Sequence, residues 1–220
     1  MTQRSTKELN VDNRGQYTEM RQALHRKIAA KLLRGKKSQE APEIIFMGGG
    51  TAVGKSTVRK KYIKTYAPHG GIAVIDCDDI KEFIPEYKDL KKENVQTAAD
   101  LVHKESGDIA MFALRLALDA RMHIVFDATM KDADWYEGLV GSIKEEGYAT
   151  IAIIVHAPLE VAIEREAVRA EKMERHVPRE DIIKSHRLVR ESFMVIEEFL
   201  PGMEESEVYD WTKYTEFYVR

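Results

Sequence analysis

Apolar residues in this chain gather in short continuous runs, separated by longer stretches with helical periodicity. A short apolar run bounded by turn residues is typical of a strand that is buried on both faces. Five segments have this character, the last being the shortest: 43–47, 72–75, 123–126, 151–155 and 207–209. Because helical segments separate these strands, the pattern predicts an α/β fold with a parallel five-stranded sheet and helices on both faces.

The N-terminal part of the chain divides into a polar segment and a helical one. Residues 1–15 have no apolar period, so we expect a mobile arm. Residues 16–34 are predicted to form an amphipathic helix, with apolar positions every four residues: Met20, Leu24, Ile28 and Leu32. The other face of this helix is basic: Arg21, Arg26, Lys27, Lys31 and Arg34. We interpret it as a solvated face, with a partner-binding surface as the alternative, within a single domain spanning residues 1–220.

The clearest chemical signal follows the first strand, at residues 49–56. These residues read G-x-x-x-x-G-K-S, the P-loop pattern, and a helical segment follows them. Backbone N–H groups of such a loop point at phosphate oxygens, Lys55 adds a positive charge, and the Ser56 hydroxyl is a ligand suited to Mg²⁺. The sequence therefore predicts a P-loop NTPase fold with ATP and Mg²⁺ as cofactors. The predicted nucleotide-binding residues are Gly49, Gly50, Thr51, Ala52, Val53, Gly54, Lys55, Ser56 and Thr57.

Two of the other predicted strands end abruptly in acidic residues. Asp76 and Asp78 follow the second strand, and Asp127 and Thr129 follow the third. Ligands of an open parallel sheet bind beyond the carboxyl ends of its strands, so the P-loop and both acidic segments are expected at one edge. Transfer of a phosphoryl group to a hydroxyl needs a carboxylate that accepts the hydroxyl proton, and a second carboxylate can hold Mg²⁺. We therefore favour Asp78 and Asp127 as functional residues.

Arginines follow in the C-terminal part of the chain. Arg165 and Arg169 lie four residues apart on a predicted helix, and Arg175 stands at the turn into the next one. Cations stabilise the charge on a phosphoryl group during its transfer, so we interpret these helices as an arginine-bearing helical lid. The alternative is an ordinary solvated face on which Glu166 offsets Arg169.

Composition narrows the range of functions. The chain has 34 basic and 37 acidic residues and a formal net charge of −3, so no overall field attracts nucleic acid or an anionic membrane. Cys77 is the single cysteine, and the first residues contain no apolar leader, so we expect a cytoplasmic protein without disulfides. The histidines follow no metal-binding pattern, and no G-x-S-x-G motif supports hydrolase chemistry.

Together these motifs resemble the zeta toxin family of P-loop kinases. The resemblance covers about residues 43–210. Besides the P-loop it rests on Ile75-Asp76-Cys77-Asp78-Asp79-Ile80-Lys81 followed by Pro85-Glu86-Tyr87, and on Asp127-Ala128-Thr129, Ile163-Glu164-Arg165 and Arg175-His176-Val177-Pro178. Two positions differ from the family pattern: Asp127 is shorter than the usual glutamate, and Ile84 replaces the histidine that usually precedes the proline.

The resemblance implies a role for each matching residue. Asp78 would be the general base, and Lys55 and Ser56 would contact the phosphates and Mg²⁺. Asp127 and Thr129 would hold the acceptor substrate. Apart from the resemblance, we take Asp76 and Arg169 as further candidates for binding the acceptor. Arg165 and Arg175 would clamp the phosphates.

The resemblance also implies a substrate and a partner. Characterised members phosphorylate a hydroxyl of a UDP-activated amino sugar and are neutralised by a small helical antitoxin, which we would expect at the N-terminal helix. The residues leave two alternatives open: a polynucleotide, nucleoside or antibiotic kinase, and a non-catalytic nucleotide-binding switch. The net negative charge and the lack of a stripe of aromatic and basic residues argue against nucleic acid.

Overall fold

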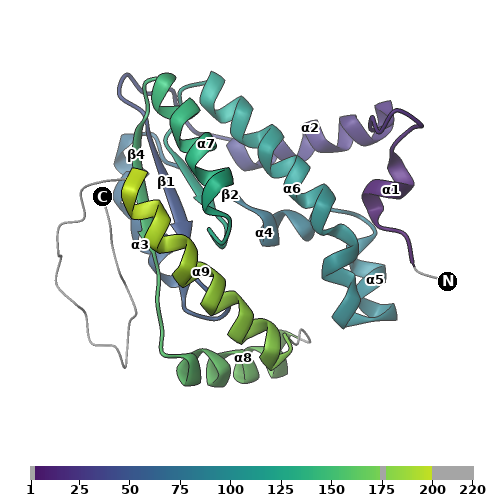
Figure 1. Ribbon diagram of the computed structural model, residues 1–220. Helices are drawn as coiled ribbons and strands as arrows, with labels where there is room; N and C mark the ends of the chain where they lie inside the picture. Colours follow the sequence, from purple (N-terminus) through teal and green to yellow (C-terminus); the bar gives the residue numbers. More distant parts are fainter. Residues whose placement is uncertain (1–2, 174–176, 200–220) are drawn as a thin grey trace.

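The computed structural model describes residues 3–173 and 177–199 and contains one parallel sheet (Figure 1). Its strands lie in the order β2-β3-β1-β4. They are β1 (Glu43–Gly48), β2 (Ala73–Asp76), β3 (Ile124–Asp127) and β4 (Ala149–Ile154). The predicted α/β fold with a parallel sheet is confirmed. The predicted number of five strands is wrong for the described residues, which form four; the segment expected as the fifth, 207–209, lies outside them.

Helices cover both faces of the sheet (Figure 1). They are α1 (Thr6–Asn10), α2 (Glu19–Leu33), α3 (Lys55–Tyr66), α4 (Cys77–Lys81), α5 (Tyr87–Glu93), α6 (Val95–Asp119), α7 (Ala133–Glu145), α8 (Leu159–Met173) and α9 (Arg179–Phe199). No helix among the described residues has the length and apolar character needed to cross a membrane.

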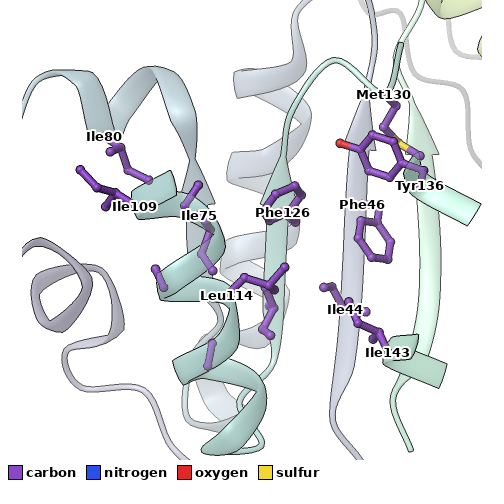
Figure 2. Close-up of a cluster of buried hydrophobic side chains, with 14 of the residues drawn as sticks. Ile44, Phe46, Ile75, Ile80, Ile109, Leu114, Phe126, Met130, Tyr136 and Ile143 are labelled. Carbon is purple, nitrogen blue, oxygen red and sulfur yellow. The ribbon is translucent and has the colours of Figure 1, made fainter. Parts of the chain in front are cut away.

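The core has two parts because successive strand residues point to opposite faces of the sheet. Ile44 and Phe46 of β1 belong to the larger cluster, with residues of α6 and α7 (Figure 2). Ile45 and Met47 of the same strand belong to the smaller cluster, which α3 covers. Figure 2 shows Ile80 beside residues of the larger cluster, so the short helix α4 is anchored to the core directly after β2.

The N-terminal segment differs from the expected mobile arm. Residues 6–10 form helix α1, in which Ser5 and Glu8 cap the first turn reciprocally. The helix is joined to α6 by a hydrogen bond from Thr6 Oγ1 to the Leu101 carbonyl and by an ion pair between Lys7 and Asp108, at 2.8 Å. Polar contacts with α6 therefore order a segment that has too few apolar residues to form a core of its own.

Helix α2 lies within the segment expected to be helical, but its faces differ from the expected ones. Met20, assigned to the apolar face, is 84% exposed. Arg21, assigned to the solvated basic face, is buried and donates to Glu86 and Glu105. Glu105 lies in the middle of α6 and is fully buried, and a buried carboxylate requires a cation. The need to compensate this charge turns Arg21 inward.

Candidate active site

The P-loop connects β1 to α3, as the sequence predicts, and it lies against neighbouring backbone. Gly49 has φ 140° and Gly54 has φ 109°, conformations that favour glycine. A Cβ at Gly49 would also clash with the Val155 carbonyl at the end of β4. The Gly49 N–H donates to the Thr129 carbonyl at 3.2 Å, which ties the loop to the segment after β3. The glycines thus allow the loop to fit between two strand ends.

Lys55 begins α3 and folds back over the loop. Its Nζ donates to the carbonyls of Gly49 at 2.9 Å and Gly50 at 3.3 Å. Burial lowers the pKa of Lys55, and the carboxylates of Asp127 and Asp78 oppose this effect. The ammonium group therefore contacts the P-loop backbone and is influenced by the charges of the strand-end acids.

Ser56 is the candidate contact for Mg²⁺. Its side chain is exposed at the first turn of α3, next to Lys55. Mg²⁺ that accompanies a nucleotide is held by a few protein oxygens together with phosphate oxygens and water. The described residues contain no group of three or more His, Cys, Asp or Glu side chains placed to hold a metal ion. The exposed Ser56 hydroxyl is one such protein oxygen, placed where it could contact an ion that accompanies a nucleotide.

Asp76, Asp79 and Asp127 meet at one cation, Arg59 of α3. Its guanidinium contacts Asp76, Asp127 at 2.9 Å and Asp79 at 3.0 Å. Asp76 and Asp127 are paired in register on neighbouring strands, which explains why one side chain reaches both. The sequence analysis missed Arg59. Its position four residues after Lys55, on the same side of the helix, is the signal that could have identified it.

Asp127 is the most buried of these acids and is 5% exposed. Burial and the neighbouring Asp76 raise its pKa to about 6, against the opposing charges of Lys55 and Arg59. Asp76 also caps α4, because its Oδ1 accepts hydrogen bonds from the N–H groups of Asp78 and Asp79. Asp76 and Asp127 are therefore held in place by the fold.

Asp78 has a different environment from its neighbours. Its side chain is 55% exposed and accepts a hydrogen bond at 2.8 Å from Lys81, not from Arg59. A carboxylate that is this accessible to solvent can meet an incoming hydroxyl. The geometry is therefore compatible with the role predicted for Asp78.

The predicted arginines of the C-terminal helices have different surroundings. Arg165 donates from Nη1 to the Val53 carbonyl at 2.9 Å, so α8 contacts the P-loop. Arg169 forms an ion pair with Glu166, as the alternative interpretation proposed, although Glu166 is buried and not solvated. Arg175 lies outside the described residues.

Helix α9 contacts the P-loop through two residues that the sequence analysis missed. Ser185 Oγ accepts from the Thr51 N–H at 3.2 Å, and His186 Nε2 lies 3.0 Å from the Thr51 carbonyl oxygen. A Cβ at Gly50 would clash with the His186 ring. No local motif marks Ser185 or His186, and only the packing of α9 against the loop identifies them.

Comparison with known proteins gives matches of three kinds. The family model described as zeta toxin matches residues 29–220. Toxin PezT of Streptococcus pneumoniae is 27% identical over 142 residues, which cover 64% of this chain and 55% of that protein. A calmodulin calcium-dependent NAD kinase of Arabidopsis thaliana is 28% identical over 110 residues, which cover 47% of this chain and 21% of that protein. The chain thus spans about half the length of PezT and about a fifth of the plant protein.

Solved structures have the same fold. A structure from the PezAT chromosomal toxin-antitoxin system of Streptococcus pneumoniae has a TM-score of 0.69 at 22% identity, covering 83% of this chain and 74% of that one. The complex AvrRxo1-ORF1:-ORF2 with ATP has a TM-score of 0.68 at 20% identity, covering 90% of this chain and 70% of that one. Because the family model matches well over half of the sequence, this chain belongs to the zeta toxin family.

Proposed function

We propose that this protein is an ATP-dependent kinase that transfers the γ-phosphoryl group of ATP to a hydroxyl of a small acceptor. One observation carries the proposal: the helix that begins at the P-loop Lys55 also carries Arg59, whose guanidinium contacts the strand-end carboxylates of Asp76 and Asp127. A phosphate-binding cation and candidate catalytic acids are thus close enough to act on one reacting group. A pure nucleotide switch would not require these acids beside the P-loop.

In the proposed reaction the acceptor oxygen attacks the γ-phosphorus of ATP. The new O–P bond forms as the bond between the γ-phosphorus and the bridging oxygen breaks, and ADP leaves. The hydroxyl proton passes to the carboxylate of Asp78. Lys55 and Arg165 stabilise the charge on the phosphoryl oxygens, and Ser56 would contact Mg²⁺, which neutralises phosphate charge.

We assign the acceptor side to Asp127 and Thr129, with a UDP-amino sugar as the favoured acceptor class. Asp76 and Arg169 are engaged by Arg59 and Glu166, so their contribution would be to maintain the shape of the site. Helices α8 and α9 would act as a lid, which the contacts of Arg165 with Val53 and of His186 with Thr51 support. We regard residues 1–220 as one domain.

A small antitoxin protein is the proposed partner, and α2 is its proposed docking site. Met20, Arg26 and Lys27 are exposed on this helix. One similar structure comes from a toxin-antitoxin system. Co-expression with neighbouring small open reading frames, followed by affinity capture, tests this partner, and Met20→Glu should abolish the capture.

The kinase proposal is tested by incubating the protein with ATP, Mg²⁺ and a panel of acceptors. The panel contains UDP-N-acetylglucosamine, other nucleotide sugars, nucleosides, aminoglycosides and 5′-hydroxyl oligonucleotides, and mass spectrometry detects the gain of one phosphate. Asp78→Asn should abolish transfer while ATP affinity, measured by calorimetry, stays within about twofold. Lys55→Ala should lower both the rate of transfer and the affinity for ATP. Asp89→Asn, in an exposed aspartate with a lysine three residues later, is the matched control and should behave as wild type.

Two outcomes favour the alternatives. Phosphorylation of the oligonucleotide or of an aminoglycoside alone would support the other kinase classes. Tight ATP binding without any labelled acceptor, together with unchanged behaviour of Asp78→Asn, would support a nucleotide-binding switch.

A further inference from the structure

A buried lysine holds the carboxylate of the proposed base. Lys81 lies at the end of α4, one helical turn after Asp78, and its Nζ donates to Asp78 Oδ1 at 2.8 Å. The side chain of Lys81 is 7% exposed, whereas that of Asp78 is 55% exposed. The pair therefore joins a solvent-accessible acid to a cation that is almost completely removed from water.

Stability alone does not explain a lysine at this position. Lysine is among the side chains least often buried, because its charge loses hydration there. Ile80, the preceding residue, is fully buried, so the protein around α4 accepts apolar side chains. An apolar side chain of similar volume at position 81 would avoid the cost of desolvating the ammonium group.

The three-residue spacing of Asp78 and Lys81 does not explain the burial of Lys81 either. Asp89 and Lys92 of α5 have the same three-residue separation and a similar N–O distance of 2.7 Å. Their side chains are 73% and 67% exposed, as expected for an ordinary surface ion pair. The burial of Lys81, and not the presence of an i, i+3 pair, is the unusual feature.

We propose that Lys81 is a positioning residue for the transfer reaction. Its buried ammonium holds Oδ1 of Asp78, which restricts rotation of the carboxylate and favours the ionised form that accepts a proton. This inference rests on the proposed function, because it assigns Asp78 the role of base. Lys81 acts through Asp78 and does not itself contact ATP.

Other charged and titratable groups surround the pair. Asp76, Cys77 and Asp79 belong to the same segment, Lys55 faces it from α3, and His103 faces it from α6. Burial lowers the pKa of His103, and the charges of Lys81 and Lys131 add to this effect. Of these groups, Lys81 donates directly to the carboxylate of Asp78.

The test compares Lys81→Met with wild type, using ATP as donor and UDP-N-acetylglucosamine as acceptor. We expect kcat to fall about ten- to a hundredfold while KM for ATP stays within about twofold, because only the orientation of the base is affected. The acidic limb of the pH–rate profile should move up by about one pH unit, because a cation that favours the carboxylate is lost. Lys81→Arg should restore most of kcat, and Lys92→Met is the matched control that should change nothing.

A second measurement does not depend on kinase activity. Carboxyl ¹³C NMR, with Asp78→Asn for assignment, should show Asp78 titrating at a higher pH in Lys81→Met than in wild type. Lys81→Gln serves the same purpose if the methionine variant does not fold.

The outcomes separate the two proposals. Wild-type protein that phosphorylates no acceptor contradicts the proposed function, whereas an upward shift of the Asp78 titration still supports the contact between Lys81 and the carboxylate. Active wild type together with unchanged kcat, pH profile and titration in Lys81→Met overturns the role of Lys81. A loss of kcat that is matched by an equal loss of ATP affinity and of thermal stability would assign Lys81 a merely structural role and also overturn the proposal.

Discussion

Arg59 of the P-loop helix donates from Nη1 to Asp127 at the end of β3, over 2.9 Å. The same guanidinium contacts Asp76, the neighbouring strand-end residue of β2. The helix that starts at Lys55, the proposed phosphate contact, therefore also compensates the acids of two adjacent strands. This contact connects the donor side of the proposed site to its acceptor side.

Replacing Arg59 by methionine should destabilise the protein by about 3–5 kcal/mol. The change removes the cation that hydrogen-bonds the buried carboxylate of Asp127, which costs more than the loss of an exposed ion pair. Urea unfolding measures the effect. Arg115→Met is the control: Arg115 contacts Asp119 and Glu146 on the exposed surface, and its loss should cost about 1 kcal/mol or less. Equal losses in the two variants would argue against the bridging role of Arg59.

The stability of the variant Asp127→Asn, measured relative to wild type, should increase as the pH rises. The pKa of Asp127 is raised to about 6 from the ordinary 3.8, so folding disfavours its ionised form. This group contributes most to stability below pH 3.8, and the contribution is lost as the pH rises through 6. The gain of the asparagine variant over wild type should therefore be small at pH 4 and reach at most about 3 kcal/mol at pH 8. Thermal melts across this range measure it, and a difference independent of pH would contradict the buried location of the charge.

The variant Arg21→Met should loosen the N-terminal helices from α6. Burial opposes ionisation of Glu105, but hydrogen bonds from Arg21 and His25 outweigh it and lower the pKa to about 2. The stabilisation from this depressed pKa is present above about pH 4.5 and is lost as the pH falls towards 2.

Loss of Arg21 leaves Glu105 without its main cation, so we expect a cost of about 3–5 kcal/mol at pH 7 and a smaller one at pH 3. Denaturant unfolding at the two pH values, with hydrogen exchange of α1 and α2, measures both effects. Arg26→Met, at an exposed position on the same helix, should leave stability within about 0.5 kcal/mol of wild type. A cost for Arg21→Met that is larger at pH 3 than at pH 7 would refute the argument.

Gly50→Ala should displace α9 from the P-loop. The added Cβ would clash with the His186 ring, so the contact of His186 with the Thr51 carbonyl should be lost. We expect a destabilisation of about 1–3 kcal/mol and weaker ATP binding. Calorimetry and thermal melts measure the two quantities.

The double variant Gly50→Ala/His186→Ala should recover most of this loss, since the clash is removed with the ring. Gly107→Ala is the control, because a Cβ at Gly107 meets no atom within 4 Å. If the effects of Gly50→Ala and His186→Ala on stability and ATP binding are simply additive, α9 does not pack on Gly50.

The sequence predicted the fold class and much of the candidate site because both depend on local patterns. Continuous apolar runs between helices indicate a buried parallel sheet, and the spacing of Gly49, Gly54 and Lys55 predicts a phosphate-binding turn. Asp76 and Asp127 could be assigned to one edge because residues that follow parallel strands share that edge. The registered pairing of these two residues agrees with that reasoning.

Only the tertiary structure decided which charges are buried and which partners they have. Arg21 looked like a surface residue because its partner Glu105 lies 84 positions away in the sequence. Ser185 and His186 reach the P-loop from the other end of the chain, and Lys81 differs from Lys92 only in the protein that surrounds it. Backbone conformation follows from neighbouring residues, and a sequence displays those directly. The environment of a charge follows from residues that are distant along the chain, and only packing brings them together.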